Sequence, residues 1–386
     1  MDHMDFNFDR VYPRRLSDSV KWNRFPEDVL PLWVADMDFP APSEVINAVE
    51  ERLDHSLFGY ACENDELRQL ICDWLARRHQ WVVDPDHILF MDGVVSGLNW
   101  VAQALLRPGE GIAFQTPVYH PFFKISAYAG CPFAEIPLVE GENGYQIDFD
   151  LFENCLESRT RLFILCNPHN PVGRVFTRSE LEKIGEICLK NDILICSDEI
   201  HGDLTFSGQT HIPLASLSPE VAERTITLMA PSKTFNMPGL NLAFAVVSNP
   251  ELRAKLQKGR RGVVGAPGLL STAAARGAYR GGDGWLNALL AYLEGNRDFL
   301  MNYLKEKIPA IRAFPPQGTY LAWLDCREMK MDEIPSKFFL EKARVALNNG
   351  LDFGQAGTGF VRLNFACPRS ILIQALERMI EAVKSA

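Results

Sequence analysis

Four positions in this sequence place a reactive or polar side chain directly after a short apolar run. Lys233 stands in Ser-Lys-Thr-Phe, Asp198 in Ser-Asp-Glu, and Asn170 in Asn-Pro-His-Asn-Pro-Val-Gly. Gly93 and Ser96 lie in a turn ahead of an expected helix, whose first backbone N–H groups would suit a phosphate. An amine, a carboxylate, an amide and an anion site are together what a pyridine ring with an aldehyde and a phosphate arm requires.

Each of these signals, taken alone, has an ordinary structural explanation. The glycine turn can be only a turn, and two Asn-Pro pairs can be only a stiff extended turn. Asp198 can be a helix cap or half of a structural ion pair, because a buried carboxylate needs a partner. Lys233 can be a solvated surface charge. Their order along the chain, at the ends of successive apolar runs, favours a single site.

The elements that must position these residues alternate between short apolar runs and amphipathic segments. One helix is expected over Arg178–Lys190, with Thr177 as its N-cap and Glu180 three residues later. Strands that are apolar on both faces and separated by helices predict a mostly parallel seven-stranded sheet between helices, with ligands at the carboxyl ends of the strands. The expected strands are Ile88–Met91, Ile112–Gln115, Phe133–Pro137, Leu162–Cys166, Ile193–Ser197, Thr225–Met229 and Ala243–Ser248.

The pattern changes near Trp285 and indicates a smaller α+β domain. We expect a helix over about 285–308, strands at 320–324 and 360–366, and helices at 336–348 and 370–385. The predicted division is an N-terminal arm, residues 1–44, that contributes to the small domain, a large domain over 45–284, and a small C-terminal domain over 285–386.

Composition excludes several classes of partner. The 386 residues carry a net charge of −10, which disfavours nucleic acid and anionic membranes, and no apolar run is long enough to span a bilayer. The beginning of the sequence lacks the features of a secretory signal, and the nine cysteines never fall at C-x-x-C spacing. We therefore expect a cytoplasmic protein with free thiols. The histidines show no metal-binding spacing, so no metal site is predicted.

The motifs together resemble one enzyme superfamily over essentially the whole chain. Asn170 to Asp198 spans 28 residues and Asp198 to Lys233 spans 35, and Pro-Gly-Leu follows the lysine motif. These motifs and spacings are similar to those of fold-type I, pyridoxal-phosphate-dependent enzymes of the class I/II aminotransferase superfamily. The resemblance implies that superfamily's α/β fold and pyridoxal 5'-phosphate as cofactor.

The resemblance also implies roles for individual cofactor-binding residues. Lys233 resembles the catalytic Schiff-base lysine, and Asp198 the partner of the pyridinium nitrogen. Asn170 would bond the phenolic oxygen of the cofactor, and Tyr119 resembles the aromatic residue that stacks on its ring. The residues that resemble phosphate contacts are Val94, Val95 and Ser232.

Two further residues matched by resemblance concern the substrate and a partner subunit. Arg362, in Phe-Val-Arg-Leu-Asn, resembles the arginine that binds the substrate α-carboxylate, and Asn170 would also face the substrate. Tyr60 resembles the tyrosine that reaches the cofactor phosphate of the neighbouring subunit. The resemblance therefore implies a homodimer with shared active sites.

Two departures from the ordinary aminotransferase pattern bear on the reaction. Asn241 follows Pro-Gly-Leu where an arginine is common, and His201 stands three residues after Asp198 where a tyrosine is frequent. With the string Leu-Trp-Val-Ala-Asp-Met-Asp-Phe at residues 32–39, both departures resemble the MalY/PatB-type cystathionine β-lyase branch. Ala35, inside this string, is then expected at the substrate, and His201 at the cofactor.

The reaction implied is α,β-elimination, in which a cysteine S-conjugate such as L-cystathionine yields a thiol, pyruvate and ammonia. Transamination begins with the same proton abstraction, so an aminotransferase stays an alternative. A regulatory protein that uses this fold to bind a partner is a second alternative, although the sequence contains no DNA-binding motif.

Overall fold

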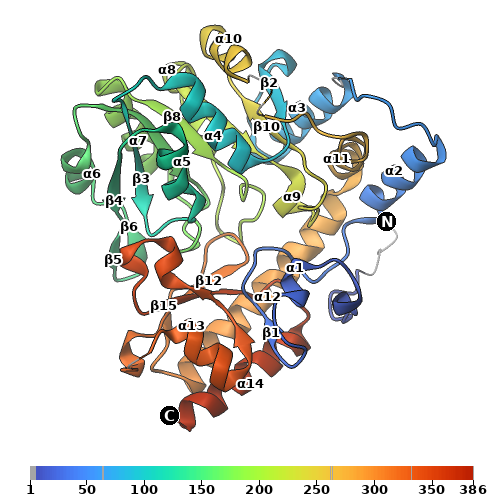
Figure 1. Ribbon diagram of the computed structural model, residues 1–386, viewed down its shortest axis with the longest axis vertical. Helices are drawn as coiled ribbons and strands as arrows, with labels where there is room; N and C mark the ends of the chain where they lie inside the picture. The colour runs from blue at the N-terminus through green and yellow to red at the C-terminus, as the bar shows by residue number, and fades with distance from the viewer. Residues whose placement is uncertain (1–5, 63–64, 261, 263, 332, 386) are drawn as a thin grey trace.

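The computed structural model describes residues 6–62, 65–260, 262, 264–331 and 333–385 (Figure 1). A seven-stranded sheet forms its centre, in the order β2-β10-β9-β8-β7-β3-β4. Neighbouring strands are parallel except at β10, which is antiparallel to both β2 and β9. The strands are β2 (Ile88–Met91), β3 (Gly111–Thr116), β4 (Phe133–Pro137), β7 (Thr160–Cys166), β8 (Leu194–Asp198), β9 (Thr225–Met229) and β10 (Ala243–Val246). The mostly parallel seven-stranded sheet expected from the sequence is confirmed.

Helices cover both faces of this sheet, which explains why most of its strands are buried along nearly their whole length. One face packs against α4 (Val94–Leu105), α5 (Pro121–Ala129) and α10 (Pro250–Gly259). The opposite face packs against α3 (Asp65–His79), α6 (Phe149–Cys155), α7 (Arg178–Lys190) and α11 (Leu269–Gly281). Helix α7 begins with the predicted capping box, in which Thr177 and Glu180 bond each other's backbone N–H groups.

The C-terminal part is built on a four-stranded antiparallel sheet in the order β11-β12-β15-β14. Helix α12 (Asp283–Lys307) leads into it from the large sheet and packs against α14 (Arg369–Lys384) (Figure 1). The strands are β11 (Arg312–Ala313), β12 (Leu321–Asp325), β14 (Asn348–Asn349) and β15 (Phe360–Asn364). The domain limits at residues 44/45 and 284/285 stay predictions.

The helix expected over 336–348 is wrong in its second half. Helix α13 (Pro335–Phe338) continues as a π-turn to Ala343, where Arg344 takes a left-handed conformation with φ of 55°. Residues 345–349 instead enter two short strands, and the first, β13 (Val345–Ala346), pairs in parallel with β1 (Leu30–Pro31) of the N-terminal arm. Pairing with a segment more than 300 residues away overrides the local helical pattern.

The remaining α-helices and strands lie outside the seven-stranded and four-stranded sheets. They are α1 (Val20–Asn23), α2 (Ser43–Asp54), α8 (Pro219–Ala222), α9 (Pro231–Thr234) and the hairpin of β5 (Val139–Gly141) and β6 (Gly144–Gln146). In the described part of the chain, no helix combines the length and the apolar character needed to cross a membrane.

Candidate active site

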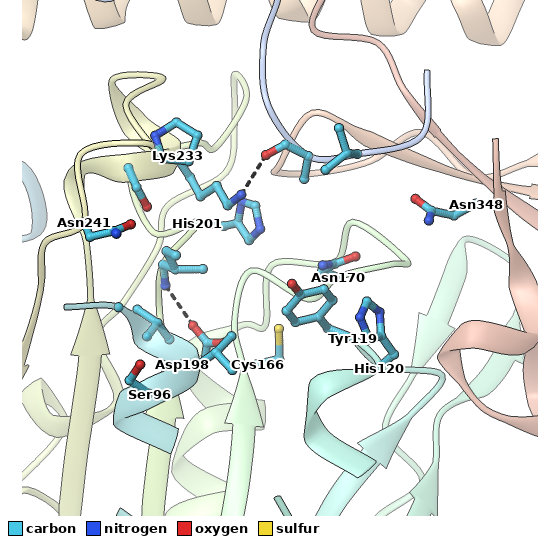
Figure 2. Close-up of a pocket in the computed structure, with 18 of the residues that line it drawn as sticks. Ser96, Tyr119, His120, Cys166, Asn170, Asp198, His201, Lys233, Asn241 and Asn348 are labelled. Carbon is cyan, nitrogen blue, oxygen red and sulfur yellow. Dashed lines mark hydrogen bonds between the residues drawn. The ribbon is translucent and has the colours of Figure 1, made fainter. Parts of the chain in front are cut away.

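A cavity of about 500 Å³ lies where the carboxyl ends of β7 and β8 meet the arm and β15 (Figure 2). It is the place where an open α/β sheet binds ligands. All the site residues named from the sequence line it except Tyr60: Ala35, Val94, Val95, Tyr119, Asn170, Asp198, His201, Ser232, Lys233 and Arg362. Tyr60 is exposed in the loop between α2 and α3 and does not line the cavity of its own chain. Its role at a neighbouring subunit stays a prediction.

The N-terminus of α4 forms one wall of the cavity. The first intrahelical hydrogen bond runs from Gly97 N to Gly93 O, so the N–H groups of Val94, Val95 and Ser96 have no acceptor inside the helix. These three residues line the cavity, and together with the positive end of the helix dipole they form an anion site. The side chains of Ser232 and Asn241 line the same cavity.

Asp198 ends β8 as a buried carboxylate. It accepts a hydrogen bond from Ile200 N at 3.2 Å. Burial, helped by the neighbouring Glu199, raises the pKa of Asp198 to about 7. A carboxylate in this position gains from a cationic partner, which would restore its ionised form.

Lys233 projects from α9 towards the arm. Its Nζ donates a hydrogen bond to the carbonyl oxygen of Ala35 at 2.6 Å. Burial, together with the positive charge of Arg362, lowers the pKa of Lys233 to about 8. Because its pKa lies near neutral pH, a useful fraction of the amine is unprotonated and can act as nucleophile or base.

The guanidinium of Arg362, on β15, is held in place by hydrogen bonds to three separate segments. Its Nη1 donates to Asn170 Oδ1 at 2.9 Å, and its Nη2 to Asn348 Oδ1 at 2.6 Å and to Trp33 O at 3.0 Å. The buried Nε has no hydrogen-bond partner among the described residues. A guanidinium held in one orientation suits bidentate binding of a carboxylate.

Two rings complete the cavity. Tyr119 lies next to His120 in the close-up of Figure 2, with the two ring centroids 4.8 Å apart. His201 is buried, and its Nδ1 lacks a hydrogen-bond partner among the described residues. Burial lowers the pKa of His201 to about 3, so this imidazole is neutral at physiological pH.

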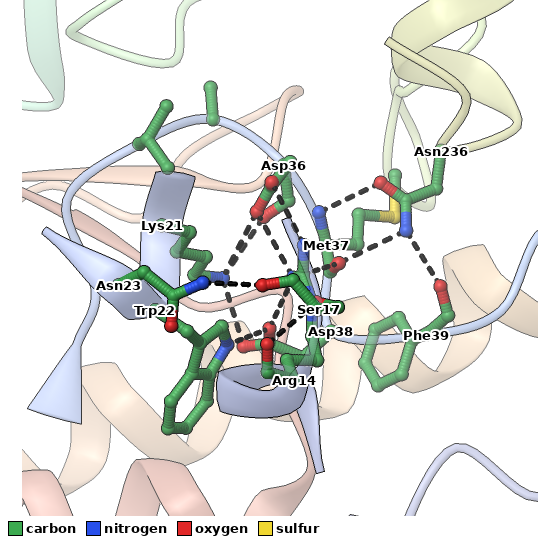
Figure 3. Close-up of polar contacts among 12 residues, drawn as sticks. Arg14, Ser17, Lys21, Trp22, Asn23, Asp36, Met37, Asp38, Phe39 and Asn236 are labelled. Atoms are coloured by element: carbon green, nitrogen blue, oxygen red, sulfur yellow. Dashed lines mark hydrogen bonds and ion pairs between the residues drawn. The ribbon is translucent and has the colours of Figure 1, made fainter. Parts of the chain in front are cut away.

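A buried charge cluster fixes the arm segment that faces Lys233 (Figure 3). Lys21 Nζ donates to Asp38 Oδ2 at 2.9 Å and lies 3.6 Å from Asp36 Oδ1. Arg14 pairs with the same two carboxylates. This cluster was not predicted from the sequence, although two carboxylates inside an apolar string indicate that cations lie nearby.

Amide side chains hold the same segment from two other directions. Asn236, three residues after Lys233, donates to Met37 O and Phe39 O and accepts from Met37 N. Asn364 of β15 donates to the carbonyl oxygens of residues 34 and 36 at 2.7 Å each. The carbonyl of Ala35 is therefore held at Lys233 by contacts on both sides of it.

Asn348 is a second residue of the site that was not predicted from the sequence. It bonds Arg362 and lines the cavity, yet the sequence placed it inside a helix. No local signal could have found it, because its position depends on the pairing of β14 with β15.

The donor set of this cavity fits pyridoxal phosphate. The α4 N-terminus and Ser232 suit its phosphate, and the buried Asp198 suits a protonated ring nitrogen. The Asn170 Oδ1 is occupied by Arg362, which directs the amide NH₂ as a donor for a phenolic oxygen. The Lys233 amine is the group that an aldehyde would meet.

Residues 27–379 match the family model for aminotransferase class I and II, so the chain belongs to that family. It is 38% identical to cystathionine beta-lyase PatB of Bacillus subtilis, over 98% of this chain and 100% of PatB. It is 31% identical to the protein MalY of Escherichia coli, over 98% and 99% of the two chains. Cystalysin of Treponema denticola, solved with a pyridoxal 5'-phosphate cofactor, superposes with a TM-score of 0.96 at 34% identity, covering 99% of this chain and 100% of that one.

Proposed function

We propose that this protein is a pyridoxal-phosphate-dependent carbon–sulfur β-lyase. It cleaves L-cystathionine or a related cysteine S-conjugate to a thiol, pyruvate and ammonia. The observation that carries this proposal is that Lys233, Asp198 and Arg362 line one cavity, in a chain that aligns along its whole length with cystathionine beta-lyase PatB.

Each residue has a defined task in this reaction. When bound, the cofactor supplies an electron-withdrawing ring that acidifies the Cα–H bond of the amino acid. Arg362 binds the α-carboxylate and fixes which bond at Cα faces Lys233. The amine of Lys233, with its lowered pKa, takes the Cα proton, and Asp198 holds positive charge at the ring nitrogen.

The products follow from the loss of the Cα proton and the Cβ thiolate from the substrate. The electron pair of the Cα–H bond forms a Cα–Cβ double bond as the Cβ–S bond breaks, and the thiolate leaves with its electron pair. The resulting 2-aminoacrylate takes up water and yields pyruvate and ammonia, so no oxidant or second substrate is needed.

The Lys233→Ala variant tests whether catalysis or binding carries the function. The variant should lose the visible absorbance of a lysine-bound cofactor and should form no pyruvate, while a Lys255→Ala control on the exposed side of α10 keeps both. If a biological effect of the protein survives Lys233→Ala, a regulatory binding role is the better account.

We infer that the protein is a homodimer in the cytoplasm. Apolar side chains are exposed along the arm and the α2–α3 loop, including Leu16, Val20, Leu57 and Phe58, where a second copy would cover them. Sedimentation should give about twice the monomer mass, and a monomer that keeps full activity would contradict shared sites. The nine cysteines are free, which suits a reducing compartment.

A further inference from the structure

A second cavity adjoins the catalytic one on the side away from Lys233. It is a groove of about 650 Å³ between α5, α13 and the segment after α1. Trp33, His120 and Asn348 line both cavities, so the two spaces adjoin at these three residues. In Figure 2, His120 and Asn348 lie on the same side of the catalytic cavity.

Arg362 connects the groove to substrate binding. Its Nη2 bonds Asn348 Oδ1 and Trp33 O, two of the residues at the junction of the cavities. An amino acid held through its α-carboxylate by Arg362 therefore has the groove within reach of its side chain. The groove is where the leaving group of a long cysteine S-conjugate would extend.

The groove is cationic in a chain whose net charge is −10. Its charged lining consists of Arg24, Lys124 and Lys337 against Asp352 alone. In the part of the chain that the structure describes, Arg24 and Lys124 form no ion pair, whereas Lys337 lies 3.8 Å from Glu341. Two of the three cations are therefore available to an anion.

The geometry of Arg24 favours a planar anion close to the junction. Its guanidinium lies over the Trp33 ring, 5.0 Å from the centroid, which limits the orientations it can take. Phe25, Leu340 and Leu347 also line the groove, so methylene groups can be covered along its length. Burial lowers the pKa of His120, which keeps this ring neutral at physiological pH and leaves the charge to the arginine and lysines.

We propose that this groove is a leaving-group subsite for thiols that end in a carboxylate, with Arg24 and Lys124 as its specificity-determining residues. This inference rests on the proposed lyase function and narrows its substrate class. A carboxylate at the far end of the thioether meets the two cations, and an accompanying ammonium can meet Asp352. Neutral S-alkyl conjugates of the same length gain only the apolar contacts.

The test compares two substrates of nearly equal shape, S-(3-carboxypropyl)-L-cysteine and its carboxamide, by pyruvate release. For the wild-type holoenzyme we expect a lower KM for the acid, with similar kcat. Arg24→Gln and Lys124→Gln should each raise KM for the acid about threefold, and the double variant about tenfold, which are the effects of partly solvated ion pairs. KM for the carboxamide should not change.

Two controls separate charge from packing. Arg24→Lys keeps the charge and should retain most of the preference for the acid, and Lys255→Gln removes a cation from α10, far from α13 in Figure 1, and should have no effect. Raising the ionic strength should reduce the wild-type preference, because exposed charges are screened.

A failure of the subsite proposal and a failure of the lyase function give different results. The subsite proposal is wrong if the wild-type protein releases pyruvate from both substrates with equal KM, or if the double variant still has a lower KM for the acid than for the carboxamide. In both cases the lyase function stands. If neither substrate nor L-cystathionine yields pyruvate, the lyase function itself is wrong.

Discussion

Replacing Asp198 by asparagine should stabilise the cofactor-free protein. Burial raises the pKa of this carboxyl to about 7 from an ordinary value of 3.8, so the folded state retains a proton that the unfolded chain has released. The penalty for folding grows as the pH rises between these two values and is complete above pH 7. Three pKa units correspond to about 4 kcal/mol. The amide does not titrate, and its oxygen can still accept from Ile200 N.

Urea unfolding of the cofactor-free proteins at pH 5 and pH 8 measures this effect. The free energy of unfolding of Asp198→Asn should exceed that of the wild type by about 3 kcal/mol more at pH 8 than at pH 5. The reason is that the wild-type carboxyl loses stability over about two pH units, from pH 5 to its pKa of about 7. Asp192→Asn, a change at an exposed aspartate, should show no such growth. An advantage that is the same at both pH values would refute the reasoning.

The same variant should have the opposite effect once cofactor is added. Among the described residues Asp198 forms no ion pair, and a protonated ring nitrogen would supply a cationic partner, so the carboxylate should become favourable in the complex. Asp198→Asn should therefore weaken pyridoxal phosphate binding and lose most pyruvate release. A variant that is both more stable without cofactor and equally active with it would contradict the assignment of Asp198.

Three further measurements test other parts of the structure. The rate at which cofactor-free protein attaches pyridoxal phosphate should rise with pH around a midpoint of about 8, set by the lowered pKa of Lys233, and a midpoint near the ordinary 10.5 would contradict its burial. Lys21→Met should lower the free energy of unfolding by about 1.5–3 kcal/mol, because the buried Asp38 loses one charged hydrogen bond and keeps Arg14, whereas Arg344→Gln at an exposed ion pair should change the stability little. Arg362→Lys should raise KM about tenfold or more with a smaller change in kcat, since a lysine cannot form the bidentate contact, and an unchanged KM would exclude Arg362 as the carboxylate site.

The large sheet could be predicted because its strands carry their own signal. Runs such as Thr225–Met229 are buried on both faces, so composition alone identifies them. The N-cap of α7 was equally local, since Thr177 and Glu180 bond one another within a single turn. The site residues at strand ends followed from these elements once their motifs were compared with a known superfamily.

Contacts between distant segments could not be predicted from the sequence. Asn348 reaches Arg362 only because residues 345–349 leave the helical path and pair with β1 and β15. The charge cluster around Lys21 likewise needs the arm to fold back on itself. Such contacts depend on tertiary pairing, for which a local pattern offers no signal.

The most direct test of the central claim is pyruvate release from L-cystathionine with no 2-oxo acid present. The holoenzyme should show the visible absorbance of a lysine-bound cofactor and should release pyruvate and thiol steadily through many turnovers. A band that bleaches once, without pyruvate, and recovers only when a 2-oxo acid is added would mean that the protein is an aminotransferase. If no band forms even after pyridoxal phosphate is added, the assignment of the cofactor is contradicted.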